Sequence, residues 1–71
     1  MLTIENTVKG KIAAMGPCTF SELVHEARTQ ATEPDADNPY LCRLAVVAAI
    51  NTLMKSGTIE LYDTGDSYDL A

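Results

Sequence analysis

The chain has no tryptophan, a single phenylalanine, a single histidine and few basic residues. Five lysines and arginines stand against ten aspartates and glutamates, which gives a net charge of −5 over 71 residues. Proteins that bind duplex DNA usually present a basic face, because phosphate contacts and counterion release supply most of their affinity. The shortage of positive charge therefore argues against strong DNA binding.

Long hydrophobic runs are also missing. No apolar stretch approaches the roughly 18 residues that cross a bilayer, and the first residues lack the basic start and apolar block of a signal peptide. Hydrophobic residues nevertheless make up 46% of the chain, enough for one small core in a chain of this length. We expect a single domain, residues 1–71, in a soluble cytoplasmic protein that has no contact with membranes.

The two cysteines, Cys18 and Cys42, are fewer than a small extracellular protein would carry. We expect buried free thiols, with a disulfide between them as the alternative. Together with His25 they match no zinc-ligand spacing, and a fourth ligand is missing. Cys18 and His25 also lack the third group that would orient a catalytic pair. We therefore predict no metal, no cofactor, no small-molecule substrate and no enzymatic activity.

Two helices are predicted in the first half of the chain. Thr3 can cap the first, and Gly16-Pro17 ends it with a left-handed glycine cap. Its apolar stripe is Ile4, Val8, Ile12 and Met15. The stretch TFSE, Thr19 to Glu22, is a capping-box pattern that opens the second helix, which ends near Arg28 or Gln30. The apolar positions of the second helix are Phe20, Leu23, Val24 and Ala27.

The second half predicts a loop, a third helix and a hairpin. Residues 29–39 carry two prolines and no large apolar residue, which indicates a loop. Asn38-Pro39 then opens a helix that ends at Gly57, with a core stripe of Cys42, Val46, Ala49, Ile50 and Leu53. Two alternating runs around the turn 63–66 follow, with Ile59, Leu61, Tyr68 and Leu70 facing the core and Asp69 facing out. The predicted class is α+β, three helices followed by a C-terminal β-hairpin.

This order resembles the winged-helix family over nearly the whole chain. The stretch AAINTLMKSGTIELYDTGDSYDL resembles the end of that fold through Ala49-Ile50, Leu53, Gly57, Ile59 and Tyr68-x-Leu70, and TFSELVHEA resembles its second helix, with Thr19 as cap and Leu23 in the core. The resemblance names no member and carries no functional residue. It implies a third helix offered to the DNA major groove and a hairpin tip that touches the DNA backbone or minor groove.

The side of the third helix opposite its core stripe is unlike a DNA-reading surface. We predict that it is an interface, formed by Tyr40, Leu41, Leu44, Val47, Ala48, Asn51 and Lys55, with Thr52 on the same side. The partner on this side is a second copy or another protein. Two alternatives stay open: the acidic loop folds over these residues, or the first helix packs on them because the assigned phase of the third helix is wrong by one position. Contacts to nucleic acid, if any, fall to Arg43, Asn51 and Lys55.

The acidic residues have two interpretations. They are a solvated surface that keeps a small apolar protein dissolved, or they offer carboxylates to a basic partner, as a small acidic phage-encoded inhibitor would. The candidates are Glu33, Asp35, Asp37 and the acidic wing, Glu60, Asp63, Asp66 and Asp69. We predict a binding module that acts mainly through protein contacts, as a regulator or inhibitor and as a homodimer or with another protein. The alternative is a dimeric DNA-binding transcriptional regulator.

The charge distribution makes a prediction about DNA. Residues 39–57 hold two bases and no acid, but residues 58–71 hold four acids and no base. Affinity for random duplex at physiological salt should therefore be no tighter than about 10⁻⁴ to 10⁻⁶ M, the usual non-specific range. A salt-titrated gel-shift assay measures it. Nanomolar binding with a steep salt dependence would refute the prediction.

Overall fold

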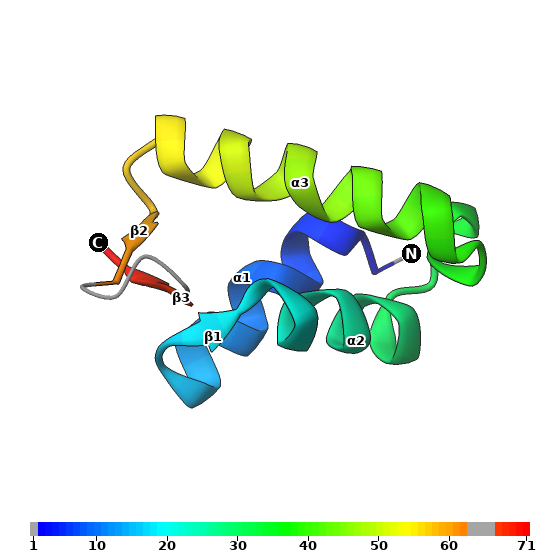
Figure 1. Cartoon of the computed structure of the whole chain (residues 1–71), viewed down its shortest axis with the longest axis horizontal. Coiled ribbons are helices and arrows are strands. Elements are labelled where there is room, and N and C mark those ends of the chain that lie inside the picture. Colours follow the sequence, from blue (N-terminus) through cyan, green and yellow to red (C-terminus); the bar gives the residue numbers. More distant parts are fainter. Residues whose placement is uncertain (1, 63–66) are drawn as a thin grey trace.

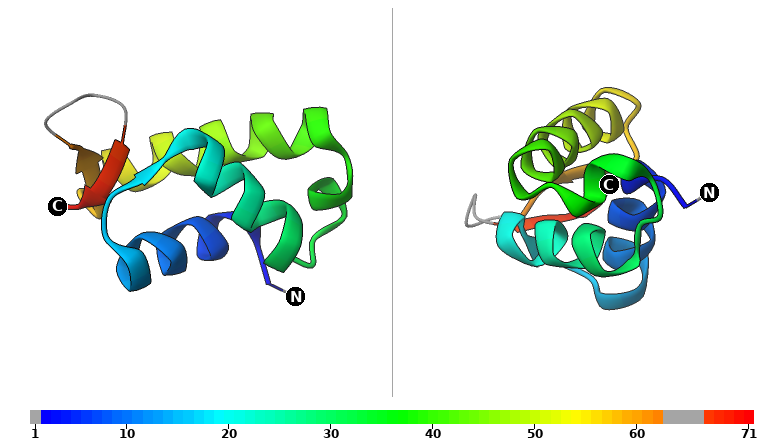
Figure 2. Two further views of the ribbon diagram at one scale, coloured as in Figure 1. Left: turned by 60° about the horizontal axis from the view of Figure 1, so that its bottom comes forward. Right: turned by 90° about the vertical axis from the view of Figure 1, so that its right-hand side faces the viewer.

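The computed structural model describes residues 2–62 and 67–71. Its elements in chain order are α1 (Ile4–Met15), β1 (Cys18–Thr19), α2 (Phe20–Gln30), the 3-10 helix η1 (Pro34–Asp37), α3 (Pro39–Lys55), β2 (Ile59–Leu61) and β3 (Ser67–Leu70). The long helix α3 lies across α1 and α2, and the strands gather at one end (Figure 1). The view along the helices shows all three grouped about one centre (Figure 2). The predicted α+β class, with three helices before a C-terminal hairpin, is confirmed.

The helices begin where their capping residues predict. The Thr3 hydroxyl accepts a hydrogen bond from the Asn6 N–H at 3.1 Å. In the capping box, the Glu22 N–H donates to the Thr19 hydroxyl at 3.2 Å, and the Thr19 N–H donates to the Glu22 carboxylate at 2.9 Å. Hydrogen bonding of the Glu22 carboxylate to Thr19, first of all to its backbone N–H, lowers the pKa of Glu22. The Asn38 side chain accepts from the first two free N–H groups of α3, so all three starts are settled by neighbours in sequence.

The turn after α1 differs in detail from the prediction. Gly16 has a positive φ of 78°, but its ψ of −144° lies outside the left-handed helical region. The residue before a proline is driven away from helical ψ values by the proline ring. The helix therefore ends at Gly16, and the two residues after Pro17 form β1.

The sheet contains a strand that the sequence does not predict. Its order is β1-β3-β2, so that β3 is central and pairs antiparallel with both neighbours. Cys18 lies opposite Tyr68, and Ile59 lies opposite Leu70. β1 has only two residues, and their partners lie 48 and 50 residues further along the chain, so local periodicity carries no signal for it.

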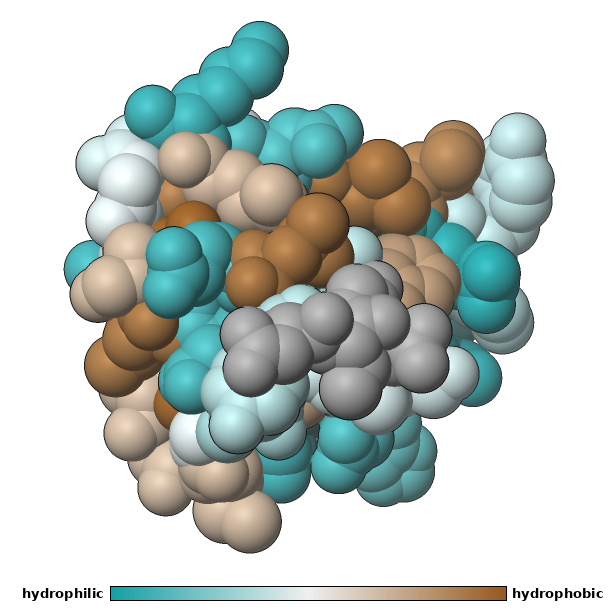
Figure 3. All heavy atoms as spheres, turned by 60° about the vertical axis from the view of Figure 1, so that its left-hand side comes forward, coloured by the Kyte–Doolittle hydropathy of each residue, from teal (hydrophilic) through white to brown (hydrophobic). Residues whose placement is uncertain are grey.

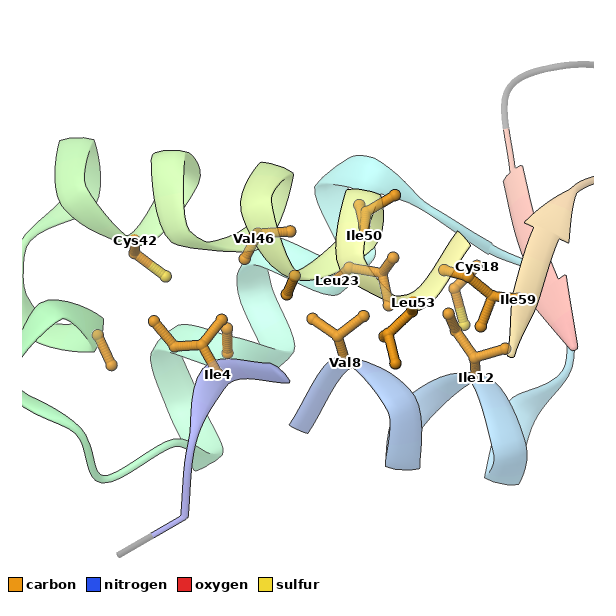
Figure 4. Close-up of a cluster of buried hydrophobic side chains, with 13 residues drawn as sticks. Ile4, Val8, Ile12, Cys18, Leu23, Cys42, Val46, Ile50, Leu53 and Ile59 are labelled. Atoms are coloured by element: carbon orange, nitrogen blue, oxygen red, sulfur yellow. The ribbon is translucent and has the colours of Figure 1, made fainter. Parts of the chain in front are cut away.

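One core joins the three helices and the first residue of β2 (Figure 4). All five predicted core residues of α3 are buried, and Ile4, Val8 and Ile12 of α1 face them. The prediction for Met15 is wrong, since its side chain is 66% exposed. Beyond Ile12, the end of the core is filled by Cys18 and Ile59 (Figure 4), which leaves no place for the last side chain of α1.

The hairpin is covered less than predicted. Ile59 is buried and Tyr68 is half-buried, but Leu61 and Leu70 are exposed and Asp69 is half-buried. The hairpin lies beyond the end of the helices (Figure 1), so they cover only the part of the sheet nearest to them. The alternation within β2 and β3 was predicted from periodicity, but periodicity does not say how far a covering layer extends.

Two adjacent valines test the phase of α3. Val46 is fully buried and Val47 is 45% exposed. Val46→Ala should lower the free energy of unfolding by about 2 kcal/mol, because it removes buried methyl groups and leaves a cavity. Val47→Ala, as the matched control, should change it by less than about 0.5 kcal/mol. Urea unfolding of dilute protein measures both, and equal losses would contradict this phase.

Candidate interaction surface

The outer face of α3 is open to solvent along its length. We define it as Tyr40, Leu41, Leu44, Val47, Ala48, Asn51, Thr52 and Lys55, all of which are exposed. Tyr40 is 69% exposed and Leu44 is 50% exposed. The opposite side of the same helix fills the core, and within residues 2–62 and 67–71 no segment covers the five apolar members, which all stay exposed.

Neither the acidic loop nor the first helix covers the outer face of α3, although the sequence left both possibilities open. Ala36 of η1 is buried in the core, while Asp35 and Asp37 remain exposed. The segment before η1 is held to the start of α1, where the Thr32 N–H donates to the Leu2 carbonyl at 2.9 Å and the Ile4 N–H donates to the Glu33 carboxylate. The loop is thus fastened away from the outer face of α3. The first helix packs on the core side, as the wheel requires.

Charge around this face is sparse. Lys55 is its only charged member, and Arg43 on the flank places its guanidinium 5.2 Å from the centre of the Phe20 ring. On α1, Lys11 forms an ion pair with Glu26 of α2 at 3.8 Å. Two of the five bases are therefore directed toward α2. Asn51 is exposed, as reading a base edge would require, but the residues between it and Tyr40 on this face are apolar.

The hairpin supplies a second exposed apolar group that sequence reasoning missed. Leu61, Tyr62 and Leu70 are each about half exposed. Seen from the hairpin end, hydrophobic side chains reach the surface in several places between hydrophilic ones (Figure 3). Of the predicted acidic wing, Glu60 is exposed and Asp69 is half-buried, whereas Asp63 and Asp66 lie outside the described residues.

Both cysteines are buried free thiols, as predicted, and the disulfide alternative is wrong. Cys18 and Cys42 lie at opposite ends of the core (Figure 4). Burial raises the pKa of each thiol. His25 is exposed on α2. In the part of the chain that the structure describes, no three His, Cys, Asp or Glu side chains gather in a way that could hold a metal ion.

A hollow of about 390 Å³ lies between α1 and α2. Leu2, Met15 and Gln30 are among its lining residues, and the paired Lys11 and Glu26 also border it. The two charges in it already neutralise each other, so no unpaired group converges on a ligand. The outer face of α3 is the stronger candidate. Within residues 2–62 and 67–71, no helix has both the length and the apolar composition of a bilayer-crossing segment.

Comparisons with protein-family models, curated proteins and solved structures found no match. The resemblance to the winged-helix family therefore stays a prediction, carried by the element order and by the residues named above. The functional argument has to come from the surface itself.

The thiols provide a test of the core next to this surface. Cys42 is fully buried and its thiol pKa is raised, so in Cys18→Ser it should react with a thiol probe at least about a hundredfold more slowly in native than in denatured protein. Val47→Cys in the same background places a thiol five residues further on, at an exposed position, and should label rapidly. Mass spectrometry measures both rates, and rapid native labelling of Cys42 would show that α3 is rotated.

Proposed function

We propose that this protein is a non-enzymatic binding module of winged-helix type that acts as a regulator or inhibitor through protein contacts on the outer face of α3. The observation that carries the proposal is the exposed apolar row from Tyr40 to Ala48, on a helix whose other side is wholly core. A helix that is apolar nearly all round is normally buried on both sides. In this proposal, a bound partner buries the exposed side of α3.

The composition of this face suits a protein partner. Protein interfaces have an apolar centre with few charges, enriched in aromatic residues and arginine. Leu44 and Val47 form such a centre, with Tyr40 at one end, Arg43 on the flank and Lys55 at the other end. A leucine and a valine that bury a further 150 Å² or so of apolar surface would contribute about 4 kcal/mol, part of which the ordering of the complex offsets.

The acidic surface supports the same choice. A nucleic-acid-binding face would gather the bases, but Arg43 lies over Phe20 and Lys11 is paired with Glu26. The exposed carboxylates Asp35, Asp37 and Glu60 would repel phosphate and favour a protein with basic groups at its rim. On the outer face of α3, the DNA-binding alternative would rest on Asn51 and Lys55, with the exposed Arg43 on the flank.

Leu44→Glu tests the proposal, with Ala13→Glu as the matched control. Ala13 is an exposed residue of α1, so the control adds the same charge away from α3. Leu44→Glu should weaken protein binding at least about thirtyfold, because a carboxylate replaces an apolar contact at the centre. Its thermal midpoint in dilute solution should stay within about 3 °C of wild type, since the residue is outside the core.

Wild type, Leu44→Glu and Ala13→Glu are each used to capture binding proteins from a host lysate, and the captured amounts are compared. Circular-dichroism melts of the same three proteins report their stability. Loss of the same captured protein from Leu44→Glu alone supports the proposal. If Leu44→Glu fails to fold, Leu44 belongs to the core and the proposal is wrong. If it folds and retains every protein contact, the outer face of α3 is not the binding surface.

A further inference from the structure

We propose that the hollow between α1 and α2 binds, as a ligand and not as a substrate, a small uncharged molecule with a largely apolar body. Its volume of about 390 Å³ lies within the roughly 300–1,000 Å³ of small-molecule sites in proteins. Within residues 2–62 and 67–71, its lining comes from Leu2, α1 and α2. The hollow therefore shares no residue with the outer face of α3, and the inference goes beyond the proposed function.

Gly10 keeps the hollow open. It lines the hollow from the interior of α1, where glycine destabilises a helix relative to alanine. Positive φ angles account for glycine at Gly16 and Gly57, but Gly10 is not among the positive-φ residues. A Cβ atom added at Gly10 would meet nothing within 4 Å, so no close approach of another described segment requires glycine either. The effect of glycine at this position is to leave space in the hollow.

Exposed apolar side chains border the same space. Leu2 precedes α1 and is 42% exposed, and Met15 ends α1 and is 66% exposed. Both line the hollow, together with Ala14. The core has no place for Met15, and a methionine side chain adapts to apolar surfaces of different shape. An apolar molecule in the hollow would remove part of this exposed area from water, which is the main source of the expected affinity.

The polar groups of the hollow favour an uncharged molecule. Lys11 Nζ lies 3.8 Å from a carboxylate oxygen of Glu26. Thr7 is buried, and its hydroxyl already donates to the Thr3 carbonyl at 2.8 Å. An ionic molecule would compete with the Lys11–Glu26 pair, and the displaced member would lose its partner beside an apolar lining. An uncharged molecule leaves both interactions in place.

Binding of 1-naphthol to ¹⁵N-labelled wild type tests the proposal directly. This uncharged aromatic probe should bind with a dissociation constant of about 1 mM or tighter, as expected for a molecule of its size. The ¹H–¹⁵N NMR signals of Gly10, Lys11 and Met15 should shift most, and those of Leu44 and Val47 should not shift. Shifts concentrated on α3 or on the hairpin would overturn the proposal.

Gly10→Leu tests the space that glycine leaves. The leucine side chain should occupy the hollow and weaken 1-naphthol binding at least about tenfold. Leucine favours a helix over glycine, and a Cβ at this position meets nothing within 4 Å, so the variant should melt at or above the wild-type temperature. Ala13→Leu is the matched control. It adds the same side chain at an exposed position of α1 outside the lining and should bind as wild type does.

A charged probe tests the class of ligand. The compound 1-naphthalenesulfonate carries the same rings with a negative charge, and it should bind wild type at least about tenfold more weakly than 1-naphthol. Glu26→Gln removes the partner of Lys11 and should narrow this difference. Glu60→Gln removes the same charge from an exposed position on the hairpin and should not narrow it. Equal binding of the two probes to wild type would show that the uncharged class is wrong.

The outcomes are independent of the proposed function. Leu44→Glu should bind 1-naphthol as wild type does, because Leu44 lies outside the hollow. Wild type that does not bind the probe, or equal binding by wild type and Gly10→Leu, overturns this inference and leaves the outer face of α3 untouched. If the probe does not bind but Gly10→Leu loses a captured protein, the hollow is a protein contact and the inference is wrong. If Gly10→Leu does not fold, the shifts in wild type decide.

Discussion

Burial of one side of α3 against α1 and α2 is the contact on which the rest of the structure depends. Val46, Ile50 and Leu53 fill the space that Val8 and Ile12 face from below (Figure 4). A 17-residue helix fixed at this angle has no freedom to turn its other side inward. The same packing that forms the core therefore decides which residues are presented to solvent, and it places an apolar row among them.

The surplus of apolar residues follows from the size of the protein. A 71-residue chain in which 46% of residues are hydrophobic can enclose only part of that surface, because a small domain buries a small share of its chain. In residues 2–62 and 67–71 the core takes thirteen hydrophobic residues. Large hydrophobic side chains also stay exposed on α3, on the hairpin, and at Leu2 and Met15, and those on α3 lie along one side of the helix. Association would complete the burial that folding leaves unfinished.

Fold and surface chemistry point to different functions. The structure shows three helices and a C-terminal hairpin, and the predicted resemblance to the winged-helix family implies that Asn51 and Lys55 would face a DNA groove. The neighbouring side chains are leucine, valine and alanine, and the chain holds twice as many acids as bases. A fold supports many functions, so the surface carries the argument. An apolar helix face whose one charged member is Lys55 is suited to protein contact.

The sequence by itself determined the features that depend on neighbours along the chain. The caps at Thr3, Thr19 and Asn38, the ends at Gly16 and Gly57, and the phase of α3 all follow from hydrogen bonds and periodicities within one or two turns. The exposed residues of α3 could thus be predicted, because a helix with a known core stripe has a known opposite side.

Only the tertiary structure decided what depends on distant segments. The pairing of β1 with β3, the exposure of Met15 and Leu61, and the insertion of Ala36 under α3 have no local signature. Each is set by where one element ends relative to another, so the covering of a side chain depends on residues tens of positions away. The absence of an intramolecular cover over α3 has the same origin, since Leu2, Ile4, Thr32 and Glu33 fasten the acidic loop to the other side.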